Sequence, residues 1–440
     1  MSGASFERHP HSAHERELLE KTARYLPAGV RNPSRSPEYA MVVREASGSR
    51  IRDWSGNEFI DYLMGSGPLL LGHAHPAVVG AVREALSRGS SYLMVNEPAI
   101  LLAEKIALAV PSAEKVCFNS TGSESTLFAM RIARAFSGRD KILKFEGGFH
   151  GMNEYALMSN QWTFAPRDHP TAVPNSAGIP RCIEDEVLIA PWNDLETTTH
   201  LIESHADELA GVICEPLQRT IPPRPGFLQG LREATSQHGI ALIFDEVVTG
   251  FRLALGGAQE YYGVVPDLTA LCKGIASGHP ISVLCGRADM MDTVDPTRHA
   301  GGLHVTQTGT FSGNPLSTTA ALATIGELER EGAYETLFAR GRRLMEGLQA
   351  MLDAAGLPAR VTGEPPAFQV WFTDEEIVDF RSTLRADHAM NVRFTELLLD
   401  RGIVKAHEKF FVSTVHSDED IDRTIAAIEG AVAELANGQA

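Results

Sequence analysis

The sequence lacks any long apolar run. A helix that spans a membrane needs about 20 consecutive, mostly apolar residues, and no stretch of the 440-residue chain approaches that length. The N-terminal residues MSGASFERHPHSAHERELLE also lack the apolar core of a secretory signal. We therefore expect a cytoplasmic protein with no membrane partner.

The chain has fewer positively than negatively charged side chains, and it has few cysteines. The chain has 39 Lys and Arg against 56 Asp and Glu, a formal net charge of −17, whereas a nucleic-acid surface needs a cationic patch. The 5 cysteines are widely spaced, without a C-x-x-C pair, and the histidines at 9–14 and 73–75 have no carboxylate at ligand spacing. We expect no nucleic-acid partner, no metal site and reduced thiols.

The middle of the chain alternates short apolar runs with amphipathic, helix-like segments. The apolar runs are nearly continuous, which is typical of parallel strands covered on both faces. This repetition predicts an α/β domain with a mostly parallel sheet flanked by helices. The runs are KVCFN, KILKFEGG, LAGVICEPL, GIALIFDEV, DLTALCKG and ISVLCGR.

A second, smaller domain is expected because one hydrophobic core rarely exceeds roughly 250–300 residues. Near the C-terminus, the helical stretch GAYETLFARGRRLMEGLQAMLDAAG is followed by short strands such as FQVWF and KFFVSTV, a pattern typical of an α+β domain. We divide the chain into an N-terminal segment, 1–60, that joins the small domain, a large α/β domain, 61–325, and a C-terminal small domain, 326–440.

A candidate phosphate-binding loop precedes the segment ESTLFAMRIARAF. The strand KVCF runs into STGSES, where Thr121 and Glu124 have the spacing of a capping box. Gly122 would let a backbone N–H approach a ligand at the positive end of the helix dipole. The pattern fits either an anion site or an ordinary capped helix. The stretch GSGPLLLG, in contrast, does not match the G-x-G-x-x-G of a dinucleotide site.

Charged residues end two successive apolar runs. Asp245 ends GIALIFD, and Lys273 ends DLTALCK 28 residues later. Ligands of open α/β sheets bind at the carboxyl ends of strands. Alone, such an aspartate could equally hold Mg²⁺, and a lone lysine there is most often solvated. An enclosed lysine, however, has a lowered pKa and attacks carbonyls, and a lysine with an acidic partner marks pyridoxal phosphate (PLP) sites. Phe149, in EGGFHG, could stack on a planar ligand.

With these residues together, the sequence resembles fold-type I PLP enzymes. More narrowly, it resembles the class III (ω-type) aminotransferases, in the branch of glutamate-1-semialdehyde aminomutase and the β-amino-acid and D-phenylglycine aminotransferases. The resemblance covers nearly the whole chain and implies a large domain with a mostly parallel sheet, a smaller α+β domain, and pyridoxal 5'-phosphate as cofactor. The motifs in the family's order and spacing are LGHAHP, STGSES, FEGGFHG, FDEVVTGFR, LCKG and GTFSGNP.

The resemblance also assigns roles around the cofactor. Lys273 is expected to bind it covalently and to move the substrate proton, and Asp245 is expected to keep the pyridine nitrogen protonated. Thr310 is expected to reach the phosphate of the neighbouring subunit, which implies a homodimer with shared active sites. The other residues are expected on the ring faces (Val247, Phe149), near the ring (Glu215) and at the phosphate (Gly122, Ser123).

The substrate side departs from the family pattern. The stretch LPAGVRNPSR places Arg35 where the aminomutase has an arginine that grips a carboxylate, with Arg31 as a nearby competitor. Glu408, in HEKFFVS, matches a glutamate near the active site of that branch. Ser66 stands where the aminomutase has tryptophan, and His279 stands where a bulky apolar residue is usual. These departures favour a transaminase with its own substrate.

We therefore expect a PLP-dependent aminotransferase that moves an amino group from a carboxylate-bearing amine to a keto acid in two ping-pong half-reactions. The donor would be an amino acid, including β-amino or aromatic ones. An aminomutase of the glutamate-1-semialdehyde type is the alternative with the same cofactor. A non-catalytic PLP-binding protein and a cofactor-free Schiff-base lyase are alternatives of other classes, although the lyase would not need STGSES or Thr310.

Overall fold

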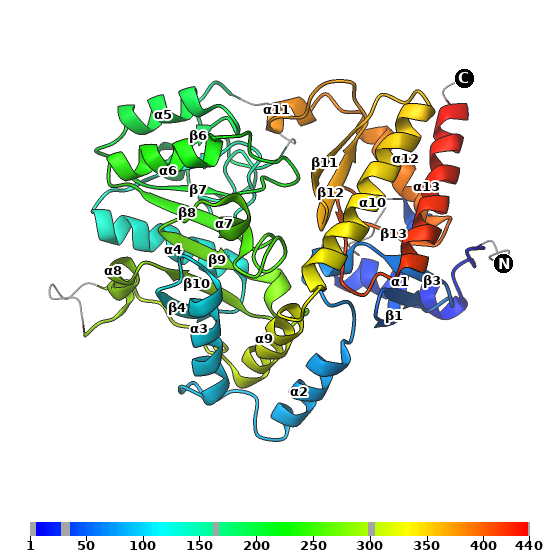
Figure 1. Ribbon diagram of the computed structural model, residues 1–440, viewed down its shortest axis with the longest axis horizontal. Coiled ribbons are helices and arrows are strands. Elements are labelled where there is room, and N and C mark those ends of the chain that lie inside the picture. Colours follow the sequence, from blue (N-terminus) through cyan, green and yellow to red (C-terminus); the bar gives the residue numbers. More distant parts are fainter. Residues whose placement is uncertain (1–5, 28–35, 162–166, 298–303, 439–440) are drawn as a thin grey trace. The chain divides into compact units, whose positions relative to one another are not determined.

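The structure is a computed structural model that describes residues 6–27, 36–161, 167–297 and 304–438 (Figure 1). The chain folds into two compact units. The terminal unit contains Met1–Pro76, Glu331–Glu376 and Arg385–Ala440, and the sheet unit contains Ala77–Arg330 and Ile377–Leu384. The division at residues 60 and 325 that the sequence suggested stays a prediction about domains.

A mostly parallel sheet of 7 strands forms the centre of the sheet unit, in the order β4-β10-β9-β8-β7-β5-β6. β8 pairs in parallel with β7 and β9, and β5 pairs in parallel with β6 and β7. β10 runs antiparallel to both β4 and β9. This confirms the predicted α/β class. The strands are β4 (Lys115–Asn119), β5 (Lys141–Phe145), β6 (Val187–Ala190), β7 (Leu209–Cys214), β8 (Ala241–Glu246), β9 (Leu268–Leu271) and β10 (Ser282–Gly286).

Helices cover both faces of this sheet, which explains why its strands are apolar throughout (Figure 1). Ile142 of β5 packs in a buried cluster with Met130 of α4. On the opposite face, Phe145 of the same strand meets the rings of Trp192 and Phe227, with centroids 5.2 and 5.6 Å away. Burying an apolar side chain of this size contributes roughly 1.5–3 kcal/mol. The helices are α3 (Glu97–Ala109), α4 (Gly122–Ser137), α5 (Leu195–Ser204), α6 (Phe227–Gln237), α7 (Gly257–Tyr262), α8 (Ala288–Met291), α9 (Pro315–Leu328) and α11 (Phe380–Thr383).

The terminal unit holds two small sheets, ordered β1-β2-β3-β13 and β11-β12-β14. In its core, Tyr62 stacks on His416 with 4.2 Å between ring centroids. Burial lowers the pKa of His416 to about 4, so this imidazole is neutral and serves packing. The strands are β1 (Val43–Ser47), β2 (Arg50–Asp53), β3 (Glu58–Asp61), β11 (Arg360–Glu364), β12 (Ala367–Trp371), β13 (Ile403–Val404) and β14 (Phe410–Phe411). The helices are α1 (Ala13–Tyr25), α10 (Ala333–Ala354), α12 (His388–Leu399) and α13 (Asp418–Asn437), while α2 (Pro76–Leu86) begins at the boundary between the units.

Membrane spans and metal centres are both missing from the described ranges. None of the helices there is long and apolar enough to cross a bilayer. The His, Cys, Asp and Glu side chains of the same ranges form no group of three or more that could hold a metal ion.

Candidate active site

Two adjacent parallel strands place Asp245 and Lys273 at the same edge of the sheet. Near the end of β8, Asp245 lies opposite Ala270 of β9. β9 ends at Leu271, and Lys273 follows after one further residue, at the start of a short 3₁₀ turn. Because parallel strands end at a common edge, the carboxylate and the amine belong to one site.

The chain around Lys273 is largely buried. The small and apolar residues that follow it, 274–276, are buried. Burial lowers the pKa of Lys273, while the nearby carboxylate of Asp245 opposes that shift. The lowered pKa raises the fraction of neutral, nucleophilic amine near pH 7.

The N-terminus of α4 reaches the same edge of the sheet. Thr121 and Glu124 form the predicted capping box, in which each side chain accepts the other residue's backbone N–H. A Cβ on Gly122 would lie 2.8 Å from Val247 Cγ2, just after β8, and 3.6 Å from Cys272 Cβ, just after β9. Glycine therefore allows the positive end of the helix dipole to approach this edge, where it attracts an anion.

Ser123 connects α4 to the loop that follows β5. Its hydroxyl oxygen accepts the backbone N–H of Met152 at 3.1 Å. A Cβ on Gly151 would come within 2.5 Å of the same oxygen, so the loop packs directly on the helix start. The hydroxyl hydrogen of Ser123 can then serve as a donor to an anion.

The same loop supplies a partner of Asp245 that the sequence reasoning missed. His150 Nδ1 lies 2.8 Å from Asp245 Oδ2, and both side chains are buried. Since an ionised carboxylate only accepts, the imidazole donates from Nδ1. The backbone N–H of Val247 donates to the other oxygen, at 3.1 Å. A signal for His150 was present, because a buried aspartate requires a partner and His150 directly follows Phe149.

Glu215 also holds this loop. Its buried carboxylate accepts the backbone N–H of Phe149 at 3.0 Å and that of Arg219 at 2.6 Å. The guanidinium of Arg219 lies 5.7 Å from the centre of the Phe149 ring. Glu215 was expected near the cofactor ring, and the contact that it makes here fixes the backbone of the residue expected to stack on that ring.

The other predicted residues lie elsewhere in the described chain or outside it. Thr310 is on an exposed loop, where the hydroxyl of Ser91 donates to its carbonyl oxygen at 3.4 Å. Ser66 and Glu408 are exposed residues of the terminal unit. Arg35 lies outside the described residues. The roles of Thr310, Ser66, Glu408 and Arg35 stay predictions.

A hollow of about 320 Å³ lies beside His279. Burial lowers the pKa of His279, so its ring is neutral at pH 7. Ser120, two residues before α4, lines the same hollow, which therefore borders the candidate anion site. Its other lining residues include Ser90, Phe311 and Asn314.

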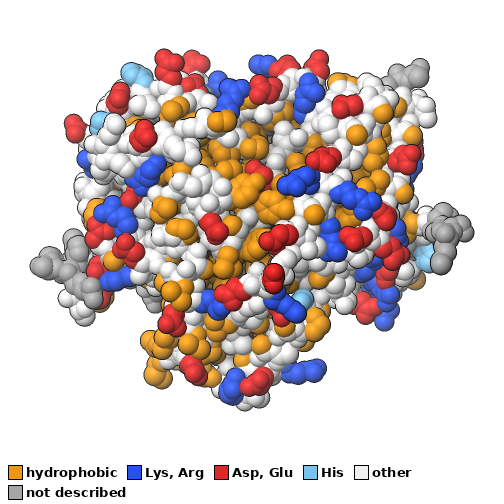
Figure 2. All heavy atoms as spheres, in the orientation of Figure 1, with side chains coloured by type: hydrophobic (Ala, Val, Ile, Leu, Met, Phe, Trp, Pro, Cys, Tyr) orange, Lys and Arg blue, Asp and Glu red, His pale blue; other side chains and the backbone are white. Residues whose placement is uncertain are grey.

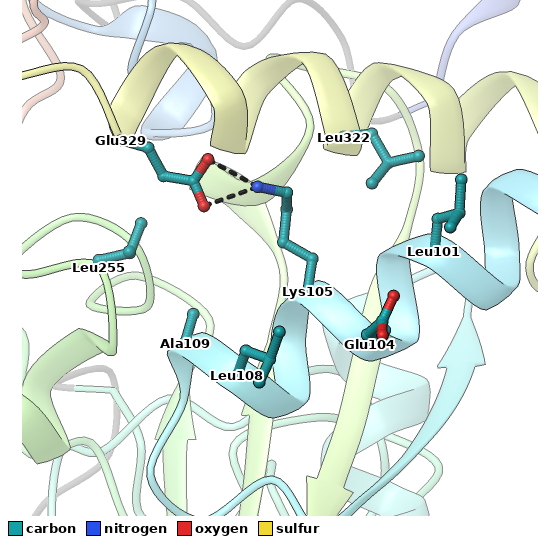
Figure 3. A pocket seen from close by; sticks show the side chains of 8 residues that line it. All are labelled: Leu101, Glu104, Lys105, Leu108, Ala109, Leu255, Leu322 and Glu329. Atoms are coloured by element: carbon teal, nitrogen blue, oxygen red, sulfur yellow. Dashed lines mark hydrogen bonds and ion pairs between the residues drawn. The ribbon is translucent and has the colours of Figure 1, made fainter.

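Another hollow, of about 380 Å³, lies between α3 and α9 (Figure 3). Lys105 and Glu329 face each other across it, with Nζ 2.6 Å from each carboxylate oxygen. Leu101, Leu108 and Leu322 supply apolar lining. A partly exposed ion pair of this kind contributes at most about 1 kcal/mol, and its two charges satisfy each other. We therefore assign catalysis to the cluster around Lys273 and Asp245.

The chain matches one known family over most of its length. Residues 32–432 match the family described as aminotransferase class-III. The chain belongs to the class III aminotransferases. Among curated relatives, glutamate-1-semialdehyde 2,1-aminomutase 2 of Brevibacillus brevis is 39% identical over 421 residues, covering 93% of this chain and 96% of the relative. The glutamate-1-semialdehyde 2,1-aminomutase of Methanosphaera stadtmanae is 37% identical over 427 residues, covering 96% of this chain and 98% of the relative.

Solved structures confirm the fold. An ω-transaminase from Sphaerobacter thermophilus superimposes with a TM-score of 0.91 at 34% identity, covering 97% of this chain and 99% of that one. A β-phenylalanine aminotransferase from Variovorax paradoxus gives a TM-score of 0.84 at 29% identity, covering 96% and 94%. A transaminase with PLP bound gives 0.88 at 28% identity, covering 97% and 98%. The predicted family and fold-type I architecture are thus confirmed.

The cofactor of this class III aminotransferase is pyridoxal 5'-phosphate, and the described residues fit it. Lys273 offers an amine of lowered pKa, and Asp245 offers a buried carboxylate for the ring nitrogen. The start of α4 offers N–H and hydroxyl donors for the phosphate. A Cβ on Gly122 would clash with Val247, so glycine lets the start of α4 come this close to the end of β8. These are the groups that the cofactor's aldehyde, pyridine nitrogen and phosphate require.

Proposed function

We propose that this class III aminotransferase catalyses an amino-group transfer of the aminomutase type, in which one carboxylate-bearing molecule exchanges the positions of its amine and its carbonyl group. The observation that carries amino-group transfer is the Lys273 amine, of lowered pKa, beside the buried Asp245. The aminomutase form is supported by curated relatives, since glutamate-1-semialdehyde aminomutases are 37–39% identical over more than nine-tenths of this chain. The sequence alone favoured a plain transaminase, and these relatives favour its alternative.

In this proposal Lys273 and Asp245 carry the chemistry. When bound, PLP would supply a carbonyl carbon for the substrate's amine and an electron-withdrawing ring. The amine of Lys273 would take the proton from the substrate carbon that bears the nitrogen and, as an ammonium, would give it back on the other side of that nitrogen. The carboxylate of Asp245, oriented by His150, holds a proton on the ring nitrogen. In the second half of the reaction, Lys273 and Asp245 would act in the reverse order and return the enzyme to its starting form.

The remaining residues of the cluster hold the cofactor in place. We assign the backbone N–H of Gly122 and the hydroxyl of Ser123 to the phosphate, because both lie at the start of α4. Val247 and Phe149 are assigned to the two faces of the ring. Glu215 keeps the backbone of Phe149 in position.

The enzyme is proposed to work as a homodimer with shared active sites. Thr310 lies on an exposed loop that contacts Ser91. Next to Ser91, residues 92–95 are apolar or aromatic and 41–81% exposed, and Phe311 is 64% exposed. Figure 2 shows further apolar side chains at the surface around α3, the helix that follows this run. Monomeric proteins rarely expose such contiguous apolar surface, so a second copy is proposed to cover it. The cytoplasmic location stays a prediction.

The aminomutase proposal predicts turnover without an external acceptor. With glutamate 1-semialdehyde as the sole substrate, we expect the purified enzyme to form 5-amino-4-oxopentanoate, because the nitrogen lost from one carbon returns to the neighbouring one. Product formation can be followed by chromatography with and without pyruvate or 2-oxoglutarate. Turnover that depends strictly on an added keto acid would overturn the aminomutase form.

A plain transaminase is the second candidate, and Ser66 is the observation that favours it. This serine stands where the aminomutase pattern has tryptophan, and the ω-transaminase from Sphaerobacter thermophilus is similar over almost the whole chain. In a screen of α-amino acids, β-amino acids and simple amines as donors, a transaminase would consume the donor only when the keto acid is present.

Arg35 is proposed to bind the substrate carboxylate. We expect Arg35→Ala to raise KM for carboxylate substrates about 10-fold or more, because a charge-assisted hydrogen bond contributes about 1.5–3 kcal/mol. KM for a simple amine should change little. Arg31→Ala is the matched control, from the same stretch of sequence, and should leave both values near those of the parent enzyme. An equal response of both substrate classes to Arg35→Ala would contradict the assignment.

A further inference from the structure

Lys144 is a buried lysine that the proposed reaction does not use. It lies in β5, where it pairs with Ile189 of β6 and Ile213 of β7, and it is 1% exposed. An ammonium is costly to remove from water, so lysine is almost never fully buried without partners. An apolar residue could occupy this strand position without the free-energy cost of removing a charge from water. The amine of Lys144 therefore has a task that an apolar side chain cannot perform.

All three hydrogens of this ammonium are directed at the loop after β5. Nζ donates to the carbonyl oxygens of Gly148 at 3.0 Å, Ala156 at 3.1 Å, and Met158. Gly148 lies three residues after the end of β5, and the other two residues lie eight and ten residues further along the same loop. One charged group thus joins the two parts of the loop on either side of residues 149–155. Only the ammonium form has three donors, because the neutral amine would turn a lone pair toward one of these carbonyls.

Between these anchor points lie the residues that the loop brings to the candidate active site. His150 donates to Asp245 at 2.8 Å. The backbone N–H of Phe149 donates to Glu215 at 3.0 Å. Each of these contacts requires the loop to keep its shape, since the two donors, a backbone N–H and an imidazole, come from consecutive residues of an irregular segment with no helix or strand of its own.

We propose that Lys144 is a positioning residue, whose charged amine holds residues 148–158 in the shape that places His150 on Asp245 and Phe149 at the ring site. It acts through the loop and touches none of the residues assigned to proton transfer. The inference rests on the proposed function for what the site does. The shape of the loop, however, can be measured without any turnover.

The geometry makes this contact sensitive to pH. Burial lowers the pKa of Lys144 to about 7, opposed by the carboxylates of Glu215 and Glu146 and reinforced by the guanidinium of Arg219. Below this pH the folded and the unfolded chains both hold the proton. Between it and the ordinary lysine pKa of about 10.4 only the unfolded chain does, so global stability rises with pH in that range. In the folded chain, the third hydrogen bond to the loop is lost as the pH rises through about 7.

Two histidines lie in the same connection between β5 and β6. His150 belongs to the loop itself, and His169 Nε2 lies 3.9 Å from the carboxylate of Glu146. A variant without the Lys144 amine distinguishes the effect of Lys144 from that of these histidines. A pH effect that persists in this variant cannot come from Lys144.

Hydrogen–deuterium exchange of peptides that cover residues 148–158 tests the inference in the holoenzyme. In the parent enzyme, corrected for intrinsic rates, we expect protection to fall several-fold between pH 6 and pH 8. In Lys144→Met, protection should already be about 10-fold lower at pH 6 and show no pH dependence. Lys141→Met is the matched control: Lys141 begins the same strand, but its ammonium pairs with Glu208 at 2.7 Å and is partly exposed. This control should match the parent.

A second variant covers the case in which Lys144→Met does not fold. Lys144→Gln keeps two of the three donors and removes the charge, and it should show intermediate protection that does not vary with pH. In both variants we expect a lower kcat with little change in KM, since substrate contacts are untouched. Parent-like protection of residues 148–158 in a folded Lys144 variant would overturn the inference, as would a pH dependence that persists in it.

Discussion

Replacing Lys273 with alanine is expected to abolish the visible absorption of lysine-bound PLP and to lower kcat at least about 10³-fold. General acid–base catalysis alone contributes about 10²–10⁴-fold, and the substitution also removes the nucleophile. The fold should survive, because the amine follows the end of β9 and its charged form is already disfavoured by burial. Absorption spectra measure the lysine-bound cofactor, steady-state kinetics measure kcat, and thermal melting measures the stability of the fold.

Lys141→Ala is the control for this prediction. Lys141 is also a lysine of the sheet unit, but it lies at the beginning of β5 and pairs with Glu208 at the surface. Its loss should leave the spectrum and kcat unchanged. A Lys273→Ala enzyme that keeps parent-like absorption and turnover would show that another amine binds the cofactor, and it would remove the basis of the proposed function.

Lys273→Ala, combined with a second variant, Thr310→Ala, also tests whether the active sites are shared between subunits. Thr310→Ala keeps Lys273, whereas Lys273→Ala keeps Thr310. If Thr310 serves the neighbouring subunit, a mixed dimer of the two variants contains one complete site, and mixing should raise activity above the mean of the separate variants. If each chain used its own Thr310, no mixed dimer could contain a complete site, and no activity would be gained.

The ends of the strands could be predicted from the sequence because their pattern is local. The runs GIALIFDEV and DLTALCKG are apolar up to the charged residue, and the structure ends β8 and β9 at Glu246 and Leu271. The capping box at Thr121 was equally readable, since its two partners lie three residues apart. The site's Lys273 and Asp245 follow from such local signals together with the rule that parallel strands end at a common edge.

Contacts between distant segments could not be predicted in this way. Asp245 and His150 are 95 residues apart in the sequence, and their pairing depends on how the loop after β5 folds back over the sheet edge. Lys144 is a polar residue within the run KILKFEGG, and no partner for it is evident in the sequence. Its three carbonyl partners become visible only when the loop is in place. Residue types in a sequence indicate which side chains could take part in a site. Backbone carbonyls are the same in every residue, so their contacts cannot be predicted from residue types.

Replacing Asp245 with asparagine is the second large effect that we expect. The amide has nearly the same shape, but it loses the negative charge that keeps a proton on the cofactor's ring nitrogen. Its NH₂ group would also face one of the two donors, His150 Nδ1 or the Val247 N–H. Removing one preorganised electrostatic contact of this kind costs about 10²–10³ in kcat. Single-turnover kinetics should show this loss in the proton-transfer step, with KM changed far less.

Glu246→Gln separates catalysis from the structural cost of altering a buried acid. Glu246 is the next residue of β8, so its side chain points to the opposite face, where it accepts hydrogen bonds from Thr249, Gln259 and the N–H of Ala258. Burial raises the pKa of Glu246. The amide should lower the stability by about 1–3 kcal/mol, because a donor replaces an acceptor in a buried site, and it should leave kcat within a few-fold of the parent. If both variants lost stability and kcat in parallel, Asp245 would be structural, and its proposed role on the ring nitrogen would be wrong.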